Sequence, residues 1–304
     1  MKKILTFILF FIFSTLSAEP VKLQYKIDKN YIEINGTHLQ TDNKDSVALI
    51  LHGTRGHQNL ELISSIASVL LENNVNSLRV NLSYGINNRN NDFLPCDINH
   101  VHKKENSIKE IKLWFNYLKQ NNYKKIYLIG HSRGGLNVIQ FYNSLTKKDQ
   151  MHISSIYLLA PLSDSFKNTS KYFLEKYQFD ISTIENNNDY FKIDFLNCPN
   201  ANVKHSSFLD YYKITNTVSG NKGSLIPNLK KINKSIFVFT ASDDTFVPLT
   251  HKRVNSILSY NKHIELIEIQ DADHFFRDFY FDDIMDGILK RMTSTYSIEN
   301  GSSD

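Results

Sequence analysis

The chain has 304 residues, of which 35 are Lys or Arg and 31 are Asp or Glu, so its formal net charge at pH 7 is +4. This length suits one α/β domain or a domain with an added lid, and no shift in composition indicates a second domain. Because positive and negative charges are nearly balanced, nucleic acid or an acidic surface is not expected as a partner.

The amino terminus is typical of an export signal. Two lysines precede the apolar run 4–13, and mostly small residues follow as far as Ala18. The run is too short to span a bilayer. We therefore expect residues 1–18 to be cleaved and the mature protein to be periplasmic or secreted, without stable membrane insertion. The alternative is an uncleaved membrane anchor, because Leu16 is larger than the cleavage rule prefers.

Strand and helix patterns then alternate along the chain. Weak alternation over 21–34 predicts antiparallel edge strands. Apolar runs predict buried strands at 46–51, 77–81, 125–129, 156–160, 236–239 and 264–269. Helical spacing predicts helices over 62–70, over 108–118, from Ser132 onward and over 284–292. This order is typical of an α/β fold with a mostly parallel sheet and helices on both faces.

Residues 162–233 interrupt the alternation. A stretch of that length between two sheet strands is expected to form its own structure, such as a lid or a binding element. It is rich in Phe and Tyr. We expect most of these aromatic residues to form a small core of the insertion and a few to line an apolar pocket.

The segment Gly130-His131-Ser132-Arg133-Gly134 matches the Gly-x-Ser-x-Gly pattern of a nucleophile elbow. It lies where a predicted buried strand turns directly into a helix. The turn is so tight that flanking side chains would collide, which explains the glycines. Ser132 would then project above the sheet edge as a nucleophile, beside the positive end of the helix. A chance match is the alternative, and the strand-turn-helix setting argues against it.

The loop His52-Gly53-Thr54-Arg55-Gly56 follows an earlier predicted strand. Attack by a serine on a carbonyl creates an oxyanion, which backbone N–H groups can stabilise. We predict that the amides of Thr54 and Arg133 form this oxyanion hole. An ordinary glycine turn is the alternative reading of the loop.

A serine nucleophile needs a base and an acid that orients the base. Asp244 follows the predicted strand 236–239, and His274 follows the last predicted strand and opens the last helix. Their order after Ser132 is the order that this kind of triad uses. His274 is therefore predicted to be the general base and Asp244 the orienting acid.

Other aspartates lie near these positions. Asp243 is adjacent to Asp244, and only one of the two can hold the histidine; the spacing to Val247-Pro248 favours Asp244. Asp164 is a third candidate for the acid. Two more aspartates, Asp271 and Asp273, are expected to cap the last helix or to face solvent.

Through His52-Gly53, the elbow, the segment 244–248 and Asp273-His274-Phe275, the sequence resembles the α/β-hydrolase superfamily over about residues 45–293. The resemblance implies an eight-stranded, mostly parallel sheet and hydrolysis of esters, thioesters or amides without a metal or organic cofactor. It implies no particular substrate. Segments 95–102 and 194–199 are also similar to a group of exported bacterial α/β-hydrolases.

The chain has two cysteines, Cys96 and Cys198. An even pair in an exported chain predicts a disulfide; two buried free thiols are the alternative. His100 and His102 have the spacing of a metal half-site. Because no further ligand cluster accompanies them, a loop packed near the site is favoured and no metal is predicted.

The sequence thus predicts a serine hydrolase that cleaves carboxylic esters or thioesters of small molecules through an acyl-enzyme. A serine peptidase for short peptides is one alternative, but no anchor for a peptide amine is evident. A non-catalytic binding protein is the other, although it would not require all three triad residues. Many esterases carry an apolar residue after the serine, so the side chain of Arg133 is available for the insertion or for a substrate anion.

Overall fold

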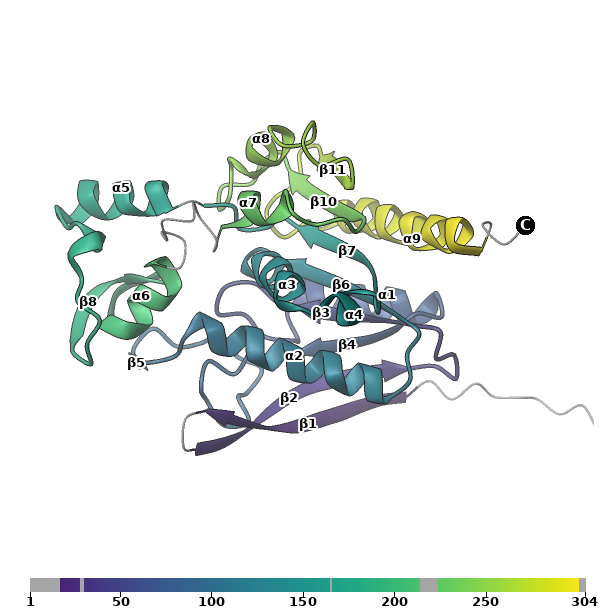
Figure 1. The fold of residues 1–304 in the computed structure, drawn as a ribbon, viewed down its shortest axis with the longest axis horizontal. Coiled ribbons are helices and arrows are strands. Elements are labelled where there is room, and N and C mark those ends of the chain that lie inside the picture. Colours follow the sequence, from purple (N-terminus) through teal and green to yellow (C-terminus); the bar gives the residue numbers. More distant parts are fainter. Residues whose placement is uncertain (1–16, 28–29, 165, 214–223, 301–304) are drawn as a thin grey trace, which may run out of the picture.

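The computed structural model describes the chain except residues 1–16, 28–29, 165, 214–223 and 301–304. Its centre is an eight-stranded sheet (Figure 1). The strands lie in the order β1 (Ser17–Ile27), β2 (Asn30–Gln40), β4 (Asn76–Val80), β3 (Ser46–Leu51), β6 (Lys125–His131), β7 (Ile153–Leu159), β10 (Ile236–Ala241) and β11 (Ile264–Ile269). In this sheet β2 runs opposite to the other seven strands, which are parallel to one another. The predicted eight-stranded, mostly parallel sheet is confirmed.

Helices cover both faces of the sheet, which explains why the central strands read as continuous apolar runs. On one face lie α1 (Glu61–Glu72) and α9 (Phe279–Asn300). On the other lie α2 (Lys104–Gln120), α3 (Arg133–Ser144), α7 (Leu225–Leu229) and α8 (Thr250–Asn255). A short helix, α4 (Lys147–Gln150), connects α3 to β7. In β7 and β10 every residue is buried.

The edge of the sheet is a long hairpin of β1 and β2, paired from Ser17 with Gln40 to Ile27 with Asn30. It extends beyond the weak alternation at 21–34. In β2, Ile32 and Ile34 are buried while Glu33 between them is only half-buried, as expected for a strand with one face on the core.

Most of the insertion forms a separate layer at one end of the molecule (Figure 1), whereas its last part, which contains α7, packs on the main sheet. The layer contains α5 (Phe166–Tyr177), the 3₁₀ helix η1 (Ile181–Thr183), β8 (Tyr190–Phe195), β9 (Cys198–Lys204) and α6 (His205–Lys213). A short strand from the main domain, β5 (Asn99–His100), joins β9 and β8 in a second sheet. Phe173, Phe195 and Phe208 are fully buried in a core of its own, as expected for most of its aromatic residues.

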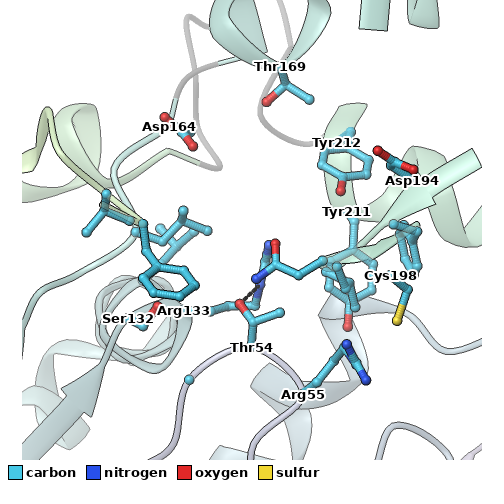
Figure 2. Close-up of a pocket in the computed structure, with 18 of the residues that line it drawn as sticks. Thr54, Arg55, Ser132, Arg133, Asp164, Thr169, Asp194, Cys198, Tyr211 and Tyr212 are labelled. Atoms are coloured by element: carbon cyan, nitrogen blue, oxygen red, sulfur yellow. Dashed lines mark hydrogen bonds between the residues drawn. The ribbon is translucent and has the colours of Figure 1, made fainter. Parts of the chain in front are cut away.

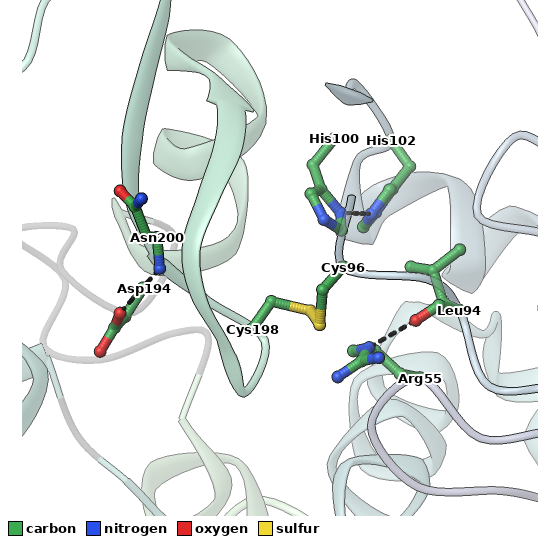
Figure 3. The surroundings of a disulfide bond; sticks show 8 residues. All are labelled: Arg55, Leu94, Cys96, His100, His102, Asp194, Cys198 and Asn200. Carbon is green, nitrogen blue, oxygen red and sulfur yellow. Dashed lines mark hydrogen bonds between the residues drawn. A yellow bond between two sulfur atoms is a disulfide. The ribbon is translucent and has the colours of Figure 1, made fainter. Parts of the chain in front are cut away.

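A disulfide between Cys96 and Cys198 ties the insertion to the main domain, with the two Cα atoms 5.3 Å apart (Figure 3). The predicted pair is therefore confirmed. The bond closes a sequence separation of 102 residues and joins β9 to the loop that leads to β5. It fixes the hairpin of β8 and β9 against the main domain at one point.

The last helix begins at Phe279, later than expected. The sequence pattern placed its start at the segment of His274, and this boundary was wrong. A carboxylate oxygen of Asp273 accepts hydrogen bonds from the backbone N–H of Phe275 and of Arg277, and Phe276 has a φ of +49°. Both features close a turn rather than a helix, so His274 lies on a loop.

The predicted signal segment, residues 1–18, lies outside the described residues apart from Ser17 and Ala18, which begin β1. It stays a prediction. Within the described parts of the chain, no helix combines the length and the apolar character that crossing a membrane requires.

Candidate active site

Ser132 occupies the turn between β6 and α3. Its φ is +53° and its ψ is −120°, a conformation that residues other than glycine rarely adopt. The turn is held from the neighbouring strand, because the N–H of Ser132 donates to the carbonyl of Leu159 (2.8 Å) and the N–H of Leu162 donates to the carbonyl of Ser132 (3.0 Å). The predicted elbow thus has a strained backbone fixed by its surroundings.

Two glycines permit the close packing at this turn. A Cβ on Gly134 would lie 2.5 Å from the carbonyl oxygens of Leu51 and His52, which are backbone atoms that cannot rotate away. A Cβ on Gly53 would lie 3.1 Å from the Cβ of Ser132. The loop after β3 therefore passes directly beside the serine.

His274 and Asp244 are hydrogen-bonded to each other, with Nδ1 and Oδ2 2.7 Å apart. The other oxygen of Asp244, Oδ1, accepts from the backbone N–H of Phe246 and of Val247, each at 2.8 Å. Burial alone would raise the pKa of Asp244, but the hydrogen bonds from His274 and the two amides outweigh it and lower the pKa. The carboxylate is thus held ionised beside the imidazole.

The alternative acids are engaged elsewhere. Asp243 is exposed, and its Oδ1 accepts from the hydroxyl of Ser242 at 3.2 Å. Asp164 pairs with Arg253 at 2.8 Å. Asp244 is the carboxylate of these three that contacts His274.

The two residues expected to supply the oxyanion amides, Arg133 and Thr54, both belong to segments that adjoin Ser132. Arg133 is the first residue of α3, so its N–H has no acceptor within the helix. Thr54 follows Gly53, whose backbone approaches Ser132. Buried His52 fixes this loop, since Nδ1 lies 2.8 Å from the carbonyl of Gly53 and Nε2 accepts from the N–H of Leu82 at 3.1 Å. Burial lowers the pKa of His52 to about 3, which keeps it neutral.

A cavity of about 730 Å³ lies over these groups, with Thr54, Ser132, Arg133 and His274 in its wall. The insertion supplies the opposite wall (Figure 2). Five of its aromatic residues line the cavity: Tyr172, Phe173, Phe195, Tyr211 and Tyr212. The expectation that a few insertion aromatics line a pocket therefore agrees with the structure.

Two neighbours of His274 were not found from the sequence. His131, the second residue of the elbow, has Nε2 2.9 Å from the carbonyl oxygen of His274, and burial lowers its pKa to about 3. Phe246 lies with its ring centroid 4.9 Å from that of His274. In the sequence, His131 lies within the elbow and Phe246 lies two residues after Asp244. These positions do not indicate which residues they contact.

Two cations of the cavity wall, Arg55 and Lys104, were also missed. Arg55 belongs to the oxyanion loop, but its side chain had no assigned role. Lys104 begins α2, where the helix dipole makes a cation unfavourable. This unfavourable position is the local feature that could have indicated a functional role for Lys104.

His100 and His102 lie behind the cavity wall and bond to each other, with Nδ1 and Nε2 3.2 Å apart (Figure 3). His102 Nδ1 is also 3.1 Å from the hydroxyl of Tyr211, which lines the cavity. Burial lowers the pKa of His102 to about 3. The loop of His100 and His102 therefore contacts the insertion through a buried row of hydrogen-bonded rings that ends at Tyr211.

The family described as alpha/beta hydrolase of unknown function (DUF900) matches residues 28–191, more than half of the chain. No curated protein matches the sequence. Among solved structures, Est1E from Butyrivibrio proteoclasticus superposes with a TM-score of 0.67 at 18% identity, covering 91% of this chain and 99% of that one. A second structure of Est1E holds ferulic acid.

Two further structures are similar. The esterase Pf2001 from Pyrococcus furiosus gives a TM-score of 0.58 at 15% identity over 91% of this chain and 90% of its own. The alpha/beta hydrolase GrgF from Penicillium sp. sh18 gives 0.58 at 16% identity over 92% and 98%. At these identities the likeness concerns the fold.

Proposed function

Since the chain belongs to this family of α/β-hydrolases, we propose that it is a serine hydrolase that cleaves carboxylic ester or thioester bonds through an acyl-enzyme on Ser132. The observation that carries the proposal is the hydrogen bond of 2.7 Å from His274 to the buried Asp244, because His274 lines the same cavity as Ser132. Because similar structures include the esterase Pf2001 and Est1E, we would assay esters before thioesters and other acyl compounds.

The roles follow from the geometry. Asp244 accepts a hydrogen bond from Nδ1 of His274, which leaves Nε2 unprotonated and able to take the proton of Ser132. Ser132 Oγ then bonds to the carbonyl carbon, and the carbonyl oxygen becomes an oxyanion. The backbone amides of Thr54 and Arg133 would stabilise that charge.

The intermediate collapses when the bond to the leaving group breaks and His274 donates its proton to the departing alcohol or thiol. Water then gives a proton to His274 as it attacks the acyl-enzyme, which releases the acid and restores Ser132. Burial of His274 and Asp244 strengthens the electrostatic support for the imidazolium that forms in both halves.

A fluorophosphonate probe tests the proposal. It should label the protein at Ser132, identified by peptide mass spectrometry, and Ser132→Ala should abolish both labelling and hydrolysis of 4-nitrophenyl esters. Ser68, an exposed serine of α1 that does not line the cavity, offers a control: Ser68→Ala should be labelled and should hydrolyse the ester as wild type does. Labelling that persists in Ser132→Ala would disprove the assignment.

We also propose that the protein is exported. The disulfide supports this, because such bonds form and persist in oxidising compartments. Sequencing of the mature amino terminus from the periplasm or the medium tests it: a start near residue 19 is expected, and an intact Met1 in a membrane fraction would contradict both cleavage and release.

A further inference from the structure

The charges in the cavity wall are unevenly compensated. The two aspartates among its described residues are both neutralised by cations: Asp164 pairs with Arg253 at 2.8 Å, and Asp194 pairs with Lys176 at 2.6 Å. Asp194 also accepts from the hydroxyl of Tyr172 at 2.6 Å. Neither aspartate is therefore available to balance a cation inside the cavity.

Arg133 crosses from the serine to the insertion. Its Nε donates to the hydroxyl of Thr54 at 3.2 Å, and its guanidinium carbon lies 5.5 Å from the ring centroid of Tyr211 (Figure 2). Within the described parts of the chain, neither terminal nitrogen of Arg133 has a hydrogen-bond partner and no carboxylate forms a salt bridge with it. The side chain is thus held in place while its two terminal NH₂ groups keep their donors.

Two further cations lie in the same wall. Arg55 donates through Nε to the carbonyl of Leu94 at 2.7 Å, and it too has no salt bridge to a described residue. Lys104 is buried, and its Nζ has no hydrogen-bond partner among the residues that the structure describes. The carboxylate of Asp210 acts on Lys104 through its charge, but it accepts its hydrogen bonds from the backbone N–H of Lys104 and of Glu105.

Lys104 remains mostly charged at neutral pH. Burial lowers its pKa to about 8; the charge of Asp210 opposes this shift and the charge of Arg133 adds to it. A buried cation without a direct counter-ion is costly unless an anion approaches it. Among the residues that the structure describes, the cavity wall therefore carries the cations Arg55, Lys104 and Arg133 and two aspartates that are already paired with other cations. Asp210 compensates the charge of Lys104 in part, so the wall keeps an excess of positive charge.

We infer that the substrate of this hydrolase carries an anionic group, a carboxylate, which binds to the terminal NH₂ groups of Arg133 in the field of Arg55 and Lys104. This inference rests on the proposed function and specifies its substrate class. A planar guanidinium whose two terminal NH₂ groups are free can donate two parallel hydrogen bonds to a carboxylate. A neutral ester would fill the cavity but would leave these donors unpaired, which reduces its binding.

Matched ester pairs test the inference. On the acyl side, the 4-nitrophenyl half-ester of adipic acid is compared with 4-nitrophenyl hexanoate, after subtraction of the uncatalysed rate; glutarate against valerate and pimelate against heptanoate vary the reach. On the alcohol side, 4-acetoxybenzoate is compared with its methyl ester. At least one pair should show kcat/KM higher for the anionic ester by about tenfold or more, the scale of one hydrogen bond to a charged group.

Variants assign the preference to the side chain. Arg133→Met should reduce the ratio of anionic to neutral kcat/KM by about tenfold, whereas Arg133→Lys should keep part of it, because the charge remains but the bidentate geometry is lost. Lys171→Met is the control: it removes an exposed cation of α5 that pairs with Glu175 outside the cavity, and the ratio should not change.

The ratio, rather than either rate, is the readout, because the amide of Arg133 also belongs to the proposed oxyanion hole. If wild type cleaves the neutral member of every pair as well as the anionic member, the inference is wrong and the proposed function stands. If Ser132 is not labelled by a fluorophosphonate and no ester is cleaved, the proposed function fails.

A binding experiment decides the inference in that second case. Calorimetry with Ser132→Ala should show monomethyl adipate binding about tenfold more tightly than dimethyl adipate, and Arg133→Met in the same background should remove the difference. Equal affinity for the two adipates would overturn the anionic-substrate assignment without reference to catalysis.

Discussion

Replacement of Asp244 by Asn separates the orienting role of this carboxylate from its role in packing. The amide oxygen of Asn can still accept the N–H groups of Phe246 and Val247, which bond to Oδ1 at 2.8 Å. The amide nitrogen would then face Nδ1 of His274 in place of Oδ2. An NH₂ group donates there, so Nδ1 becomes the acceptor and the proton moves to Nε2.

That tautomer cannot accept the proton of Ser132. In a serine protease the same change lowered kcat by about four powers of ten while the geometry stayed intact. We expect a loss of the same order here in ester hydrolysis by Asp244→Asn, about 5 kcal/mol in activation free energy, with little change in KM. Since two of the three hydrogen bonds of the side chain persist, the free energy of unfolding should fall by only about 1–3 kcal/mol.

The assay is steady-state hydrolysis of a 4-nitrophenyl ester, with urea unfolding as a check on folding. Asp243→Asn is the matched control, because it makes the same chemical change one residue away on an exposed side chain, and its kcat should stay within about twofold of wild type. If Asp243→Asn is damaging and Asp244→Asn is tolerated, the assignment of the acid is wrong, although Ser132 and His274 can still act as proposed.

Three further predictions concern stability. Replacement of Cys96 and Cys198 by Ser should lower the free energy of unfolding in urea by up to about 4–5 kcal/mol, the loop entropy of a separation of 102 residues, and a loss below 1 kcal/mol would contradict this reasoning. Gly134→Ala should cost about 1–3 kcal/mol through its clash with the carbonyl of Leu51, measured in the same way, and an unchanged midpoint would show that the elbow can relax. Burial lowers the pKa of His102 in the folded protein to about 3, so the unfolded chain binds more protons than the folded chain between about pH 3 and 6.5. The free energy of unfolding should therefore decline as the pH falls through that range. His102→Gln should make the decline less steep, and a slope identical to that of wild type would refute the reasoning.

The parallel strands, and the places in the fold of the residues proposed for the site, could be predicted from the sequence because their signals are local. Buried strands give uninterrupted apolar runs, and the elbow gives glycine at each position where a Cβ would meet backbone, as at Gly134. Asp244 and His274 follow strands of the same sheet, β10 and β11, so parallel pairing brings their loops to one edge. Their hydrogen bond is a consequence of that register.

The rest depends on contacts between distant segments, which no local pattern encodes. Lys104 and Asp210 meet across α2 and α6, and β5 pairs with β9 over about a hundred residues. The start of the last helix was misplaced for a different and local reason: the apolar spacing continues through Phe275 and Phe276, but the carboxylate of Asp273 accepts hydrogen bonds from the backbone two and four residues on and closes a turn.

The proposed catalytic groups and most of the opposite wall of the cavity belong to different parts of the structure. The groups proposed to break the bond follow β3, β6, β10 and β11, so the sheet sets their positions, whereas the insertion has its own aromatic core and can change without moving Ser132. Arg133 belongs to both parts, since its amide begins α3 beside the serine and its guanidinium packs on Tyr211 of the insertion. An apolar residue at this position would leave catalysis and the choice of substrate independent. If the inferred carboxylate binds to Arg133, the choice of substrate depends on the position of the insertion, because the guanidinium packs on Tyr211.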